Sequence, residues 1–201
     1  MGKNKKKKNK EPEQVISIRT VEDIFEENFK YFLYKKSSSE MSKDFEDLSG
    51  YNVHWWGVDR QGYIFNLWNL GSGAIPKVVV NNLAIQDLAD FYFDNILEFS
   101  TSENIKLFPN DYYYDFVSKY EILLAQKGIF YFEAVIDYCD PRGHKIFVEH
   151  PYWYRKLVSP VKPIHIDSLD NRVQILMSYF RFDVDVKNND YIFFKSLWDV
   201  L

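Results

Sequence analysis

The sequence predicts a single α+β domain with a mixed or antiparallel sheet, in which β-hairpins are flanked by helices. Apolar residues recur at helical spacing in several segments, and aromatic and β-branched residues form short strand-like runs between them. The two patterns interleave without the regular period of βαβ units. The 201 residues are 46% apolar and 27% charged, a composition typical of a globular domain.

The N-terminal half begins with a helix predicted over residues 21–35. Thr20 and Asp23 have the spacing of a capping box, and the apolar stripe that follows is Ile24, Phe25, Phe29, Phe32 and Leu33. A short helix is predicted at 44–48.

A β-hairpin is the clearest pattern in the sequence. Two aromatic and β-branched runs, 53–58 and 63–68, are separated by a four-residue turn that ends in Gly62. Glycine at this turn position supplies the positive φ that closes a hairpin with a bulge. The loop 71–76 then leaves the second strand, and Pro76 is placed to open a helix.

The middle of the chain predicts two more helices and a second hairpin. Helical spacing covers 86–97, and Asn110 or Asp111 can cap a further helix that stops at Gly128. Residues 129–138 have the enrichment of a buried strand. A turn at 140–143 and a return strand at 144–149 follow.

The C-terminal part mixes prolines with short periodic segments. Residues 151–163 hold three prolines and are predicted to cross the surface in extended form. A short strand is predicted at 164–166, followed by a helix capped by Asp167 or Ser168. Residues 182–186 alternate as a strand would, and Asp190 is predicted to cap a final helix that ends near Trp198.

Charge divides the chain into a basic tail, 1–13, and an acidic domain, 14–201. The tail holds six of the 25 basic residues and two of the 29 acidic ones, a net charge of +4, which leaves a net charge of −8 elsewhere. A lysine run this dense repels itself and predicts a disordered segment. Nucleic acid is therefore expected as a ligand only weakly, through this tail, and the acidic domain favours a basic partner.

The remaining composition indicates a cytoplasmic protein without a membrane span. Cys139 is the only cysteine, so an intramolecular disulfide is excluded. The basic start is not followed by the apolar run of a secretory signal, and no stretch reaches about 18 uninterrupted apolar residues.

No catalytic signature, cofactor motif or metal site stands out in the sequence, so the interpretation leans against an enzyme without deciding the question. The glycine pair Gly71 and Gly73 lacks the third glycine of a dinucleotide fingerprint and the Gly-Lys-Ser/Thr of a P-loop. The densest group of metal-ligand residue types has a spacing that matches no standard pattern, and it consists of Asp140, His144, Glu149 and His150.

The aromatic residues supply the candidate binding site. Strand alternation places Trp55 and Trp56 on opposite faces of the hairpin, so one of them needs cover from a helix, a partner or a ligand. Residues 152–155 combine residue types that anchor protein interfaces, although a loop packed back on the core explains them equally well. The candidate binding residues are Trp55, Trp56, Trp68, Tyr152, Trp153, Tyr154 and Arg155.

The hairpin region also carries a resemblance. Residues 56–65 followed by 71–76 resemble a WxGxDxxGxIxxF…GxGxIP pattern of small bacterial proteins, and segments near 127–132, 160–163 and 166–169 extend the likeness over roughly residues 45–185. Such proteins are similar to the immunity-type or accessory proteins of polymorphic toxin systems. The resemblance implies binding to a toxin and carries over no catalytic residues.

The leading hypothesis is a non-enzymatic protein-binding module that neutralises a basic toxin domain through an acidic, aromatic-bearing surface. The alternative is a small-molecule or saccharide-binding module, or an unrecognised enzyme. It would use the tryptophans of the hairpin together with the loop from Gly71 to Pro76.

Overall fold

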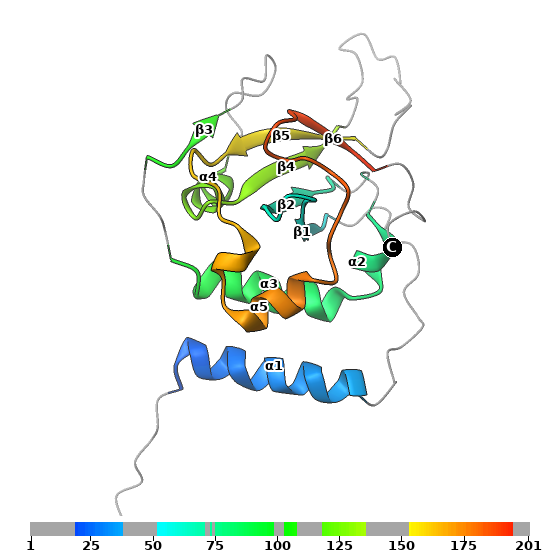
Figure 1. Cartoon of the computed structure of the whole chain (residues 1–201), viewed down its shortest axis with the longest axis vertical. Coiled ribbons are helices and arrows are strands. Elements are labelled where there is room, and N and C mark those ends of the chain that lie inside the picture. Colours follow the sequence, from blue (N-terminus) through cyan, green and yellow to red (C-terminus); the bar gives the residue numbers. More distant parts are fainter. Residues whose placement is uncertain are drawn as a thin grey trace, which may run out of the picture.

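The computed structural model describes residues 19–37, 52–70, 73, 75–98, 103–107, 118–135 and 153–194. A six-stranded mixed sheet forms the centre, with strands in the order β1, β2, β4, β5, β3, and β6 also pairs with β5. Helices α3 and α5 lie below the sheet in Figure 1, and α1 forms an outer layer beyond them. The α+β class is confirmed.

The predicted hairpin is present as β1 (His54–Val58) and β2 (Ile64–Trp68), which pair antiparallel. Gly62 has φ +93°, as its turn position requires. The carboxylate of Asp59 accepts hydrogen bonds from the backbone N–H groups of Gln61, Tyr63 and Val186, at 2.9, 2.9 and 3.2 Å. The aspartate of the hairpin motif therefore has a structural role, since it holds the turn and ties it to the C-terminal segment.

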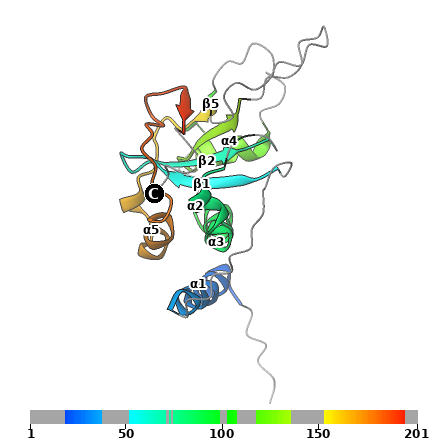
Figure 2. The same cartoon turned by 90° about the vertical axis from the view of Figure 1, so that its right-hand side faces the viewer.

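The chain passes from β2 to the parallel strand β4 (Phe130–Ala134) through a long helical connection. This connection contains α2 (Lys77–Val80), α3 (Leu83–Asn95), the short strand β3 (Lys106–Leu107) and α4 (Lys119–Gln126). Figure 2 shows α3 between the hairpin strands and α1. Pro76 occupies the N-cap position of α2, and Gly128, with φ +93°, ends α4 as predicted.

Several predictions for the C-terminal part are wrong. Residues 153–159 form strand β5 (Trp153–Ser159) between β4 and the edge strands, instead of crossing the surface. The extended conformation of this segment agrees with the prediction. Its burial does not, because the segment pairs with β4 inside the sheet. Strand β6 (Tyr191–Phe193) replaces the start of the predicted last helix, because it pairs with β5.

Other boundaries differ in detail. Helix α5 (Asn171–Met177) is capped by Asp170, whose side chain accepts from the N–H of Arg172, after a 3₁₀ turn at Ile166–Ser168. Ser118 and Glu121 form the capping box of α4. The strand predicted over 182–186 is wrong, since these residues belong to no strand, and Asp185 among them is buried. The strand predicted at 164–166 is also wrong, since only an isolated bridge joins His165 to Tyr63 there. The predictions for 44–48, 140–149 and the caps Asn110 and Asp111 lie outside the described residues.

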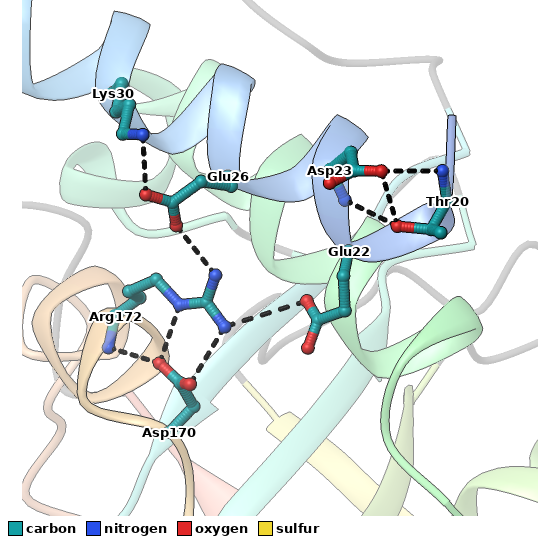
Figure 3. A network of polar contacts seen from close by, with 7 residues as sticks. All are labelled: Thr20, Glu22, Asp23, Glu26, Lys30, Asp170 and Arg172. Atoms are coloured by element: carbon teal, nitrogen blue, oxygen red, sulfur yellow. Dashed lines mark hydrogen bonds and ion pairs between the residues drawn. The ribbon is translucent and has the colours of Figure 1, made fainter. Parts of the chain in front are cut away.

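Helix α1 (Val21–Ser37) confirms the first prediction and packs on α3 and α5. Its Phe25 ring lies 5.4 Å from the ring of Tyr92. Arg172 of α5 forms ion pairs with Glu26 at 2.8 Å and with Asp170 at 2.9 Å, and Figure 3 shows it bridging α1 and α5. The capping box of Thr20 and Asp23 is present at the helix start. No helix in the described ranges is long and apolar enough to cross a membrane.

Candidate interaction surface

The two adjacent tryptophans of β1 point to opposite faces of the sheet, and both are buried. Trp55 is 0% exposed and lies 5.4 Å from the rings of Phe182 and Phe194. Trp56 is 1% exposed, stacks on Phe93 of α3 at 4.3 Å and donates its indole N–H to Asp90 at 2.9 Å. A helix thus covers Trp56, and neither tryptophan offers exposed surface. The two faces are called the Trp55 face and the Trp56 face below.

The candidate residues 153–155 differ in their exposure to solvent. Tyr154 is fully buried on the Trp55 face, whereas Trp153 is 37% exposed and Arg155 is half-buried. Tyr152 lies outside the described residues. The strand alternation of β5 therefore leaves Trp153 and Arg155 as the part of this candidate site that reaches the surface.

The loop 71–76 is described only at Gly73, Ile75 and Pro76. A Cβ added to Gly73 would lie 2.5 Å from the Cβ of Ala134, so the loop packs closely on β4 here. Because there is no room for a side chain at position 73, close packing explains the glycine there. Trp68, just before the loop, is half-buried.

One row of side chains crosses the Trp56 face from β1 to β6. Directly paired residues of neighbouring strands point to the same face, so successive pairs define the row. Its members, here called the cross-strand row, are His54, Trp68, Glu133, Arg155 and Tyr191. The row spans roughly 19 Å, from four interstrand spacings of about 4.8 Å.

Contacts along the row are aromatic at one end and ionic in the middle. The rings of His54 and Trp68 stack with their centroids 5.5 Å apart. Arg155 donates from Nε to Glu133 at 2.8 Å and also bonds it through Nη2. His54 and Tyr191, at the two ends, are exposed, whereas Glu133 is almost buried. The row is therefore exposed to solvent at its two ends and largely buried in the middle.

Three exposed aromatic side chains gather at the β6 end of the row. Trp153, Phe193 and Tyr191 are 37%, 41% and 53% exposed, and they are called the aromatic edge. The Trp153 ring lies 5.6 Å from Phe193 and 6.2 Å from Tyr191. Sequence reasoning missed Tyr191 and Phe193, although the aromatic and β-branched run of residues 191–194 is typical of a strand.

Carboxylates gather at the other end of the row, on α3. Asp87, Asp90 and Asp94 follow one stripe of this helix, and they are called the acidic corner. Asp87 and Asp94 are exposed, but partial desolvation of their carboxylates against the protein, followed by the charge of Asp90, raises the pKa of both. The pKa of His54 is lowered, because desolvation of the ring by the neighbouring aromatic side chains outweighs its hydrogen bond to Asn66 and the charge of Asp90.

Polar groups are also buried on the sheet and on α4. Asn66 and Tyr131 are 0% exposed, and Glu121 of α4 is 4% exposed. Burial is the main cause of the raised pKa of Glu121, and the charge of Glu133 adds to it. Within the described ranges, the buried Nδ2 of Asn66 and Nε1 of Trp68 have no hydrogen-bond partner.

These features define an α+β protein with one sheet face that is open at both ends. Among the residues described, no group of three or more His, Cys, Asp or Glu side chains is arranged to hold a metal ion. Comparisons with protein-family models, curated proteins and solved structures found no match for this chain.

Proposed function

We propose that the chain is a protein-binding module whose partner docks on the Trp56 face at the aromatic edge. The observation that carries this proposal is the meeting of Trp153, Tyr191 and Phe193, each more than a third exposed, at one end of the sheet. Tryptophan and tyrosine anchor interfaces because they bury a large apolar area at little cost in side-chain entropy.

Neutralisation of a toxin is the form of protein binding that we propose. The hairpin pattern resembles that of immunity-type proteins, and residues 14–201 carry a net charge of −8. Complementary charge accelerates encounter with a basic toxin domain, while the buried aromatic contacts hold the complex. An immunity-type protein needs no catalytic group, since it acts by occupying the surface of its partner.

Co-expression with the polypeptides encoded by adjacent open reading frames, followed by calorimetric titration, tests the proposal. Substitution of both Trp153 and Tyr191 by Ala should weaken a complex by about 30-fold or more, as expected for a hot spot. Tyr31→Ala is the matched control, because Tyr31 is 57% exposed on the distant helix α1. Equal affinities for the two variants, or no complex with any of these polypeptides, would overturn the proposal.

A small-molecule or saccharide-binding role, or an unrecognised enzymatic one, is the second candidate. The buried N–H groups of Trp68 and Asn66 that lack a partner in the described ranges favour it, because a ligand oxygen could accept from them. A thermal-shift screen with nucleotides, sugars and metal ions tests it. A ligand at 100 times its Kd adds about 2.7 kcal/mol of stability, so an absent shift across the panel counts against this role.

A further inference from the structure

The side chain of His54 is a flat ring held among other aromatic rings at one end of the cross-strand row. Its plane is nearly parallel to the indole of Trp68, with an interplanar angle of 6° and ring centroids 5.5 Å apart. Tyr120 of α4 meets the His54 ring edge to face at 5.5 Å, and the ring of Tyr131 lies 6.1 Å away. Because His54 is exposed and begins strand β1, a change of its rotamer carries the ring toward solvent.

The His54 ring uses only half of a buried amide. Asn66 is 0% exposed and its Oδ1 lies 3.3 Å from Nδ1 of His54, whereas its Nδ2 has no partner in the described ranges. The opposite orientation of the amide would exchange the roles of its two polar atoms and still leave one without a partner. Both polar atoms are bonded to the same carbon, so a ring in the place of the imidazole reaches both. A ring with a donor beside an acceptor would satisfy the whole amide.

A second buried donor belongs to the same group of residues. Nε1 of Trp68 is buried and has no hydrogen-bond partner among the residues that the structure describes. Trp68 and Asn66 are two positions apart on β2, so both point to the Trp56 face. Buried donors in proteins are normally satisfied by the protein, by water or by a ligand. A stacking surface and two donors thus meet at the place of the imidazole, which is called the His54 site.

Negative charge near the His54 site disfavours a ligand that carries phosphate. Desolvation, followed by the charges of Asp90 and Asp94, raises the pKa of Tyr120. The charge of Asp90 also acts on His54. Lys127 offsets part of the effect of Asp94, so Asp90 is the main source of this negative charge. A phosphate brought to the site would be repelled, whereas an uncharged ring would not.

We propose that the His54 site binds an adenine nucleoside, whose base takes the place of the imidazole. The base stacks on Trp68, its amino group donates to Oδ1 of Asn66, and its neighbouring ring nitrogen accepts from Nδ2. Asparagine makes this two-bond contact with adenine in protein–DNA complexes, and stacking of a base on an aromatic side chain is favourable. This inference rests on the second candidate function and names its ligand class. It is independent of docking at the aromatic edge.

Titration of the full chain with adenosine, followed by the NMR signal of the Trp68 indole N–H, tests the inference. Adenosine should shift this signal saturably. His54→Ala should tighten the binding about tenfold, because the imidazole no longer competes for the site. His165→Ala is the matched control and should leave the affinity unchanged, since the His165 ring is also partly exposed but lies beside Tyr63 at the turn of the hairpin.

Two related ligands separate the contacts without a change in the protein. Purine riboside lacks the amino group of adenosine and should bind about tenfold more weakly, because Oδ1 of Asn66 is left unpaired. Adenosine 5′-monophosphate should also bind more weakly than adenosine, because Asp90 repels its phosphate. Equal affinities for adenosine and purine riboside, or tighter binding of the monophosphate, would overturn the inference.

The remaining outcomes separate the inference from the proposed functions. If adenosine bound saturably neither to the natural chain nor to the His54→Ala variant, the inference would fail and water would be the group that satisfies the buried donors. Equal effects of His54→Ala and His165→Ala would overturn it as well. Stabilisation by a sugar or a metal ion, with no binding of adenosine, would keep the second candidate function and reject this ligand class.

Discussion

The two faces of the hairpin differ in the groups that cover them. On the Trp55 face, Trp55 is enclosed by other aromatic rings, including Phe182 and Phe194 from the last part of the described chain. On the Trp56 face, helices cover the centre, and the ends carry His54 and the aromatic edge. The same residue types thus stabilise the fold on one face and remain partly exposed on the other, which teaches that aromatic content alone does not locate a binding surface.

Truncation of a tryptophan on each face gives the largest contrast. Trp55→Ala should lower the free energy of unfolding by about 3–5 kcal/mol, because it leaves a cavity among buried rings. Trp153→Ala should cost under about 1 kcal/mol, since the side chain is already 37% exposed. Urea denaturation measures both values, and similar losses for the two variants would abolish the distinction between the faces.

A buried amine on the Trp55 face offers the next effect. The Lys156 side chain is 1% exposed, lies over the rings of Phe130 and Phe132, and burial lowers its pKa to about 8. The folded state then resists protonation, so stability falls as the pH drops from the ordinary pKa of 10.5 to about 8 and stays low below that.

Lys156→Met should remove this penalty and raise the free energy of unfolding at pH 7 by about 1–3 kcal/mol. The advantage should shrink toward pH 10.5. Denaturation at pH 7 and pH 10 measures it. A variant less stable than the natural protein at pH 7 would mean that the hydrogen bond from Nζ to the carbonyl of Lys187, at 3.3 Å, outweighs the burial of the charge.

The ion pair in the middle of the cross-strand row should respond asymmetrically to substitution. Arg155→Ala leaves the carboxylate of Glu133, 11% exposed, without its partner and close enough to Glu121 to raise the pKa of that group. It should cost about 1–2 kcal/mol, whereas Glu133→Gln should cost less than about 1 kcal/mol because water reaches Arg155. Equal costs in denaturation experiments would show that the middle of the row is more open than described.

The acidic corner should show the smallest effect and a distinct dependence on pH. Folding raises the pKa of Asp87 and Asp94, so the unfolded chain releases these protons first and stability falls as the pH rises above about 4. The double variant to Asn should match the natural protein at pH 3 and exceed it at pH 7 by less than about 0.5 kcal/mol, since solvent screens exposed charges. A variant that is less stable at pH 7 would indicate a compensating cation.

Local signals explain which parts of the fold were predictable. The hairpin depends on turn residues a few positions apart. The turn requires a positive φ at position 62, and the neighbouring residues of the sequence are enough to predict a glycine turn there. The start of α1 is equally local, since Thr20 and Asp23 bond each other. Strands β5 and β6 depend instead on partners 20 or more positions away, such as Ala134 for Tyr154, and no local pattern reports such pairs.

The candidate surface was predictable only in part for the same reason. Trp153 and Arg155 were predicted from their residue types. The aromatic edge, however, forms only because β6 pairs with β5, as in the pair of Arg155 and Tyr191, and this pairing joins segments that are distant in sequence. Asp190 resembles a helix cap in sequence, which hid the strand that follows it. His54 and Asp90 belong to different elements, and the charge of Asp90 acts on His54 only because the fold brings α3 against β1.

Hydroxyl-radical footprinting of a partner complex tests the central claim most directly. If the aromatic edge is the docking surface, Trp153 and Tyr191 should be oxidised more slowly in the complex than in the free chain, while Tyr31 on α1 should react at an unchanged rate. Protection of Tyr31 with unchanged oxidation of Trp153 and Tyr191 would contradict the assignment of the Trp56 face as the binding surface.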